Sequence, residues 1–169
     1  PAADAGASYT LVTGLDSKTM GSGDDSAFAV DSTTAASDTF NVSDAVDGAA
    51  GTDTFYLTID SITGDTSYTP SRIKNFEKLS ISAVNTTTTD TTTINANLMT
   101  LSTVEVSAST SEVTFTNLVA GTDFSLIGNT QPIILTHKNA GLTGTADAVT
   151  VSMVGNTGAV TINSDGVAD

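Results

Sequence analysis

Short runs in which apolar and polar residues alternate recur along the whole chain. Residues 79–83 read Leu-Ser-Ile-Ser-Ala, and residues 104–108 repeat the pattern as Val-Glu-Val-Ser-Ala. A period of two predicts a β-strand that buries one of its faces. Comparable short apolar runs predict strands at residues 9–13, 27–30, 55–59, 113–115, 124–127, 133–136, 149–153 and 160–163. We therefore expect an all-β protein.

Helix is expected to be nearly missing. Only residues 93–101 offer room for one or two helical turns, because β-branched Thr surrounds them. The Thr-rich run at residues 86–93 is expected to be a solvated loop. The later predicted strands follow one another at irregular intervals of about 10 to 25 residues, with Gly or Asn between them. Such intervals fit a β-solenoid or a β-sandwich.

Two features favour a parallel β-solenoid (β-helix) over the β-sandwich. Stacked coils need short strands with Val, Ile or Leu inside and Ser, Thr or Ala outside, and Thr and Asn can form ladders between successive coils. The chain also lacks the Trp and Cys residues that mark an immunoglobulin-type core. The β-sandwich remains the alternative at this stage.

Composition restricts the possible functions. The 169 residues suffice for one domain or one continuous stack, and the absence of Cys excludes disulfide bonds. Nineteen acidic residues against five basic ones give a net charge of −14, which would repel a phosphate backbone and argues against nucleic-acid binding. Sixteen of the acids are Asp, whose short carboxylates suit turns and sites for hard cations.

Glycine-aspartate turns lead directly into several of the predicted strands. Residues 47–57 follow the nonapeptide calcium-turn pattern G-G-x-G-x-D-x-U-x, with Ala49 at the second glycine position. Residues 21–30 form a similar turn, and residues 37–42 repeat its Asp-x-apolar ending without glycines. Calcium takes six to eight oxygen ligands, and a glycine turn exposes backbone carbonyls that a carboxylate can complete.

The turns supply a set of candidate calcium ligands. The best side-chain candidates are Asp16, Asp25, Asp53 and Asp147, with Asp24 and Asp47 in support. Carbonyl oxygens, or the turn geometry itself, would come from Gly23, Gly48, Gly51 and Gly144. For each residue the alternative is an ordinary turn without a metal. Bound calcium would neutralise carboxylates that keep adjacent coils apart, so we expect folding or assembly to depend on calcium.

In their order along the chain, these motifs resemble those of the bacterial S-layer (surface-layer) family related to repeats-in-toxin (RTX) proteins. That family has a Leu-Thr-Thr-Gly-x-Asp opening, two glycine-aspartate turns, an Ile-x-x-Phe-Glu-x-Leu-x-Ile coil and a Gly-x-Ala-Asp turn. The matching segments are residues 11–16, 21–28, 48–55, 73–81 and 144–151. The resemblance covers most of residues 9–162.

The resemblance implies a structural protein that a type I system secretes across both membranes. Such proteins self-assemble into a two-dimensional lattice on the cell surface, with calcium ordering the coils. We expect residues 1–60 to form a calcium-turn region and residues 61–169 to continue the same stack as further coils. The family's C-terminal secretion signal and tandem glycine-rich repeats are not seen in the sequence, which indicates a piece of a longer protein.

Two alternative functions stay open. The first is a domain of a large secreted RTX-type adhesin that binds a glycan or cell-surface ligand, and the second is a polysaccharide-modifying β-helix enzyme. The basic cluster of Arg72, Lys74 and Lys78 is a candidate contact for acidic cell-surface polysaccharide. No apolar stretch approaches the roughly 20 residues that a membrane span needs, so membrane insertion is not expected.

We expect no enzymatic activity. His137 is the only histidine, and its immediate segment contains neither Cys nor an acid with which it could form a catalytic dyad. A place in a surface loop is expected for it. Glu77, Glu105 and Glu112 are the remaining candidates, because two of them could pair for glycoside chemistry.

Overall fold

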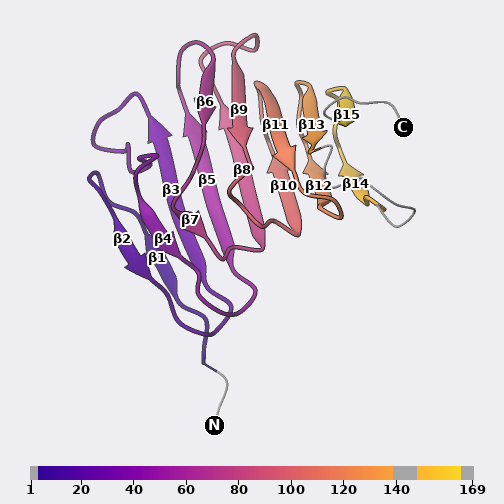
Figure 1. Ribbon diagram of the computed structural model, residues 1–169. Helices are drawn as coiled ribbons and strands as arrows, with labels where there is room; N and C mark the ends of the chain where they lie inside the picture. The colour runs from indigo at the N-terminus through magenta and orange to yellow at the C-terminus, as the bar shows by residue number, and fades with distance from the viewer. Residues whose placement is uncertain (1–3, 139–147, 165–169) are drawn as a thin grey trace.

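The chain folds as a parallel β-solenoid. The computed structural model describes residues 4–138 and 148–164, and all the regular secondary structure in those ranges is β. Every pairing between neighbouring strands in this part of the chain is parallel, so the β-sandwich alternative, which needs antiparallel sheets, is wrong. Figure 1 shows the coils stacked in chain order from the indigo N-terminal end to the yellow C-terminal end.

Three sheets make up the sides of the solenoid. Sheet A runs the whole length and contains, in spatial order, β1 (Ser8–Thr10), β3 (Ser26–Ser32), β5 (Thr54–Asp60), β8 (Lys78–Val84), β10 (Thr103–Ser107), β12 (Asp123–Ile127) and β14 (Val151–Val154). Sheet B, in the N-terminal half, contains β2 (Ser17–Thr19), β4 (Ala45–Asp47) and β7 (Ile73–Lys74). Sheet C continues to the C-terminal end and contains β6 (Thr66–Tyr68), β9 (Thr91–Asn95), β11 (Glu112–Leu118), β13 (Ile133–His137) and β15 (Val160–Ser164).

Apolar residues stack along the inside of the solenoid because each strand keeps its register with the strand before it. One inward row of sheet A consists of Ala27, Phe55, Leu79, Val104, Phe124 and Val151. The facing row of sheet C consists of Tyr68, Ile94, Phe115 and Leu135, and Ile162 continues this row in the last coil, where it is half exposed. The alternation seen in the sequence thus fills a continuous core between the sheets.

One local prediction is right only in part, and the room left for a helix is not used. Of the Thr-rich run at residues 86–93, Thr86 to Thr89 form an exposed loop as expected, but Thr91–Asn95 forms β9 and pairs with β6 and β11. Residues 93–101 form no helix. Thr is β-branched and suits a strand, and a solenoid strand needs only alternate residues inside. Thr92 and Ile94 take the inner positions and are fully buried.

Polar side chains form a hydrogen-bonded ladder at the corner where the chain leaves sheet A. We call Ser109, Asn129 and Asn156 the amide ladder; each lies directly after a sheet A strand. The Ser109 N–H donates to Asn129 Oδ1, and the Asn129 N–H donates to Asn156 Oδ1, both over 3.0 Å. Asn129 also donates from Nδ2 to the Val106 carbonyl at 2.8 Å. Each buried N–H at this corner therefore finds its acceptor one coil further along.

The amide ladder leads to a first prediction. Replacing Asn129 with Ala removes the acceptor of a buried N–H and the donor to a buried carbonyl, so the free energy of unfolding should fall by about 2–4 kcal/mol. Asn97→Ala is the matched control, because that side chain is exposed and should change the free energy by less than about 0.5 kcal/mol. Urea unfolding followed by circular dichroism measures both, and equal losses would contradict the role given to Asn129.

Candidate functional site

The glycine-aspartate turns stack at the opposite corner, where the chain enters sheet A. We call Asp25, Asp53 and Glu77 the acidic ladder; they lie just before β3, β5 and β8. The Asp25 N–H donates to Asp53 Oδ1 at 2.7 Å, and the Asp53 N–H donates to Glu77 Oε2 at 2.8 Å. Here the acceptors are carboxylates, so each coil-to-coil hydrogen bond also places a negative charge at the corner.

A second pair of acids stacks in front of sheet B. The Asp16 N–H donates to Asp44 Oδ1 at 3.0 Å, across a separation of 28 residues. The Asp16 carboxylate itself accepts hydrogen bonds from the Tyr9 hydroxyl and from the Val12 N–H. Asp44 has no exposed surface, although it is not among the ligands predicted from the sequence. It follows Asp16 by the same 28 residues that separate the first two members of the acidic ladder, and that repeat could have revealed it.

Most of the buried aspartates have both oxygens satisfied by the protein. In Asp25, Oδ1 accepts from the Ala7 N–H at 2.6 Å and Oδ2 from the Gly21 N–H at 2.8 Å. In Asp44, the second oxygen accepts from the Asn41 N–H at 2.8 Å. A carboxylate that receives a hydrogen bond at each oxygen is stable when buried without a metal. These hydrogen bonds are therefore sufficient to explain why Asp25 and Asp44 are buried.

Asp53 is different. Its side chain is only 1% exposed, and Oδ2 is buried with no hydrogen-bond partner among the described residues. Burial raises the pKa of this carboxyl group, the Asp25 N–H opposes that effect, and the nearby charges of Glu77, Asp25 and Asp24 raise it further. The corner thus contains one buried carboxylate oxygen without a partner in a field of other acids.

Two glycines let backbone oxygens approach this part of the ladder. A Cβ on Gly48 would lie 2.0 Å from the Asn75 carbonyl oxygen and 2.6 Å from Asp53 Oδ2, so no larger residue fits. Gly51 has a φ of +142°, and a Cβ there would lie 2.3 Å from the Gly23 carbonyl oxygen. The carbonyl oxygens and the carboxylate are the ligand types that calcium prefers.

The other predicted side-chain ligands have partners of their own. Asp24 is exposed and accepts from the Thr52 N–H at 2.8 Å. Asp47 forms an ion pair with Lys74 at 3.0 Å and accepts from Asn75 Nδ2 at 2.7 Å. The Lys74 ammonium is the main reason that the pKa of Asp47 is lowered.

The structure brings one group of the predicted ligands together at this corner, namely Gly23, Asp24, Asp25, Gly48, Gly51 and Asp53. Gly144 and Asp147 lie outside the described residues, so that turn stays a prediction. Within residues 4–138 and 148–164, no three His, Asp or Glu side chains are arranged to hold a metal ion together. A cation at the acidic ladder would therefore need backbone oxygens as most of its protein ligands.

The candidates for catalysis lie apart from this corner or have structural partners. Glu105 lies on sheet A, where it forms an ion pair with Lys78 at 2.9 Å, and Glu112 begins β11 in sheet C. His137 is not in a surface loop, as the sequence suggested, but is the last residue of β13 and only 2% exposed. Its ring packs edge-on against Phe124, with 5.8 Å between the ring centroids.

Comparison with other proteins adds no functional information. No protein family, curated protein or solved structure matches the chain. Among the described residues, no helix is long and apolar enough to cross a membrane.

Ala49 provides a test of the turn geometry. Its φ of 73° is in the left-handed region that glycine favours, which agrees with its place at a glycine position of the repeat. Ala49→Gly should remove strain of about 1–2 kcal/mol, partly offset by an unfolded-state entropy cost of about 0.5–1 kcal/mol. We expect the free energy of unfolding, measured with urea, to rise by up to about 1 kcal/mol.

The neighbouring Ala50 is the control for that substitution, because its φ is not positive. Ala50→Gly should only add flexibility to the unfolded chain and lower the free energy of unfolding by about 0.5–1 kcal/mol. Destabilisation of the same size in both variants would show that the turn does not impose a left-handed conformation at Ala49.

His137 predicts a pH dependence. Burial lowers its pKa, while the backbone at Asn163 opposes that effect. The unfolded chain therefore binds a proton more readily than the folded chain. The contribution of His137 to stability is complete above the ordinary pKa of about 6.5 and is lost as the pH falls below that value.

The measurement compares the wild type with His137→Gln in urea at about pH 7.5 and about pH 5.5. The free energy of unfolding of the wild type should fall more between the two pH values than that of the variant, because all other groups are shared. Equal pH dependence would contradict the buried, neutral state of His137.

Proposed function

We propose that the chain is a structural, calcium-binding segment of a secreted bacterial surface-layer protein that self-assembles into a lattice on the cell surface. The observation that carries the calcium part is the unpartnered, buried Oδ2 of Asp53 in the acidic ladder. The order of the glycine-aspartate motifs along the chain supports the surface-layer part.

The calcium assignment follows from the cost of an unsatisfied buried charge. A buried carboxylate oxygen without a partner destabilises the folded state, and the surrounding acids add to that cost. A divalent cation removes both penalties. The Asp53 carboxylate would hold it, together with backbone oxygens of the stacked turns next to Gly48 and Gly51, and the ion would neutralise the corner when bound.

The same reasoning narrows the predicted ligand set. The carboxylates of Asp16 and Asp25 receive hydrogen bonds from protein groups at both oxygens, so they are stable without a cation. Asp47 has Lys74 as its counter-charge. We therefore assign the cation to the Asp53 position. Asp25 couples neighbouring coils by accepting from Ala7 of the preceding coil, and Asp16 does so by donating its N–H to Asp44 of the next coil.

A structural role fits the shape and the charge of the molecule. Stacked coils build a rigid rod whose stability comes from contacts between neighbours. The net charge of −14 would push copies of such a rod apart, and bound cations would reduce that repulsion. The adhesin alternative is favoured by one observation, a groove on sheet B.

Asp53→Asn tests the assignment. The substitution keeps an oxygen to accept from the Asp25 N–H but removes the charge and the free carboxylate oxygen. Calcium at about a hundred times its Kd should stabilise the wild type by about 2.7 kcal/mol, and this gain should disappear in the variant. Without calcium, the variant should be at least as stable as the wild type. Thermal unfolding in calcium and in chelator measures both.

Asp44→Asn is the matched control. It also neutralises one buried aspartate, but there both oxygens accept hydrogen bonds from backbone N–H groups. It should lower stability by about 1–3 kcal/mol in either buffer and keep the full gain from calcium. A calcium gain that survives in Asp53→Asn, or no gain in the wild type, would contradict the assignment. Negative-stain imaging with and without calcium tests lattice formation separately.

A further inference from the structure

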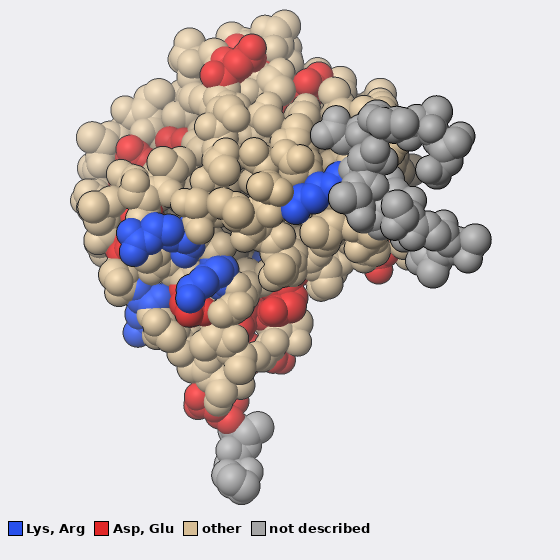
Figure 2. Space-filling model, in the orientation of Figure 1, with Lys and Arg blue, Asp and Glu red and all other residues tan. Residues whose placement is uncertain are grey.

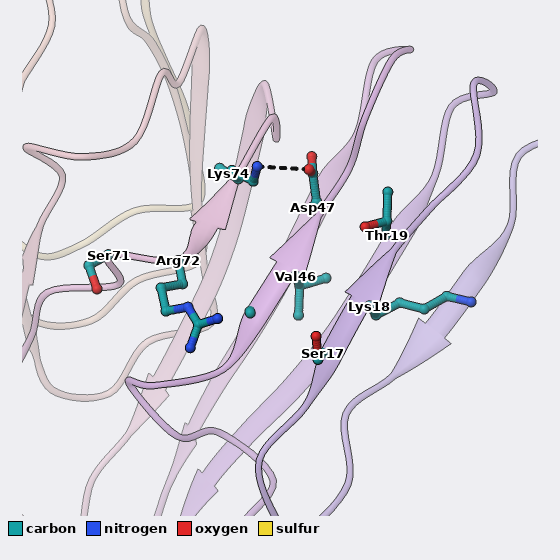
Figure 3. A pocket seen from close by; sticks show the side chains of 9 residues that line it. Ser17, Lys18, Thr19, Val46, Asp47, Ser71, Arg72 and Lys74 are labelled. Carbon is teal, nitrogen blue, oxygen red and sulfur yellow. Dashed lines mark ion pairs between the residues drawn. The ribbon is translucent and has the colours of Figure 1, made fainter.

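The outer face of sheet B has a groove of about 330 Å³ (Figure 3). Ser17, Ala45 and Val46 are among the small residues that line it, and the strands β2, β4 and β7 form its floor. Its volume is at the lower end of the range for small-molecule sites, about 300–1,000 Å³. The groove can therefore take one or two sugar-sized groups.

Two basic side chains face this groove. Arg72 and Lys74 line it, in a chain that has only five basic residues and a net charge of −14. Figure 2 shows blue side chains gathered over sheet B on a surface where red acids are otherwise scattered. Lys78 does not belong to this pair, because it forms an ion pair with Glu105 on sheet A. Lys18 borders the groove, but it shares a row with the buried residues Val46 and Ile73, so its side chain lies on the inner face of the sheet.

One of these cations has no carboxylate partner among the described residues. Arg72 makes only a 3.5 Å contact to the Ser43 carbonyl, and Figure 3 shows its guanidinium turned toward β4. Lys74 is already neutralised by Asp47. The Lys18 ammonium lies away from the groove, 5.6 Å from the centre of the Tyr9 ring.

The lining indicates what kind of anion fits. The planar guanidinium of Arg72 matches a carboxylate, which it can bind through two parallel hydrogen bonds. Hydroxyl groups of Ser17 and Thr19 and the carboxylate of Asp47 can hydrogen-bond to the hydroxyls of a ligand. No aromatic side chain lines the groove, so a base or another flat ring would find no stacking partner there.

We propose that this groove binds a carboxylate-bearing saccharide of the uronate class. Arg72 holds the carboxylate, and the Lys74–Asp47 pair and the hydroxyl groups orient the ring. The proposal is independent of calcium at Asp53. The surrounding acids repel extended polyanions, so only an anion that reaches into the groove is bound, and salt weakens the binding.

The test is a calorimetric titration of the full chain with trigalacturonate and with neutral galactotriose. The wild type should bind only the acidic trisaccharide. Arg72→Gln should weaken binding at least about tenfold. Arg72→Lys should weaken it by an intermediate factor, because it keeps the charge without the planar guanidinium. Lys18→Gln should leave it nearly unchanged, because that side chain lies on the other face of the sheet. Lys138→Gln is the control: it makes the same change in net charge in a side chain that contacts the Asn97 carbonyl, outside the groove.

Several outcomes would overturn the proposal. These are no binding by the wild type, equal binding of galactotriose, equal binding of a sulfated trisaccharide, or an equal effect of Arg72→Gln and Lys138→Gln. Each titration is run in calcium and in chelator. Binding that requires calcium and is unchanged in Arg72→Gln would assign the saccharide to a bound cation instead of the groove. Self-association that depends on Arg72, without saccharide binding, would assign the groove to a second copy.

Discussion

The backbone N–H groups at the corners of the solenoid set the constraint on which the rest of the structure depends. Within each sheet, the parallel ladder satisfies the backbone, but at the corner the chain leaves that ladder and buries its N–H groups. The protein meets this need with side chains that accept from the equivalent residue one coil earlier. Asn129 does so on one side of sheet A and Asp53 on the other. These bonds fix the register that stacks the core.

The choice of acceptor gives the two corners different properties. An amide or hydroxyl acceptor is neutral, so the amide ladder adds no charge to its corner. A carboxylate acceptor brings a charge that needs a hydrogen bond at its second oxygen, and Asp25 receives one from Gly21. In the next coil, the corresponding N–H of Ala49 donates to Asp47 instead. Asp53 is thereby left with a free oxygen. The two turns are similar, and this one hydrogen bond is what makes Asp25 a structural residue and Asp53 a candidate cation ligand.

The sequence predicted the fold class because the long strands alternate over five to seven residues, as in Lys78–Val84. It could not predict β2, β4 or β7, since strands of two or three residues show no periodicity. Asp44 was not predicted as a corner residue, because only its separation of 28 residues from Asp16 identifies it. The groove on sheet B could not be predicted from the sequence either, because Lys78 is close to Arg72 and Lys74 in the sequence and was therefore grouped with them.

The central claim is that the free oxygen of Asp53 holds a cation. A crystal structure grown in calcium, or with a lanthanide substituted for anomalous scattering, tests this most directly. The account predicts an ion about 2.3–2.6 Å from Asp53 Oδ2, completed by backbone carbonyl oxygens of the neighbouring turns. An Oδ2 that instead accepts a hydrogen bond from water or protein, with no ion beside it at saturating calcium, would contradict the account.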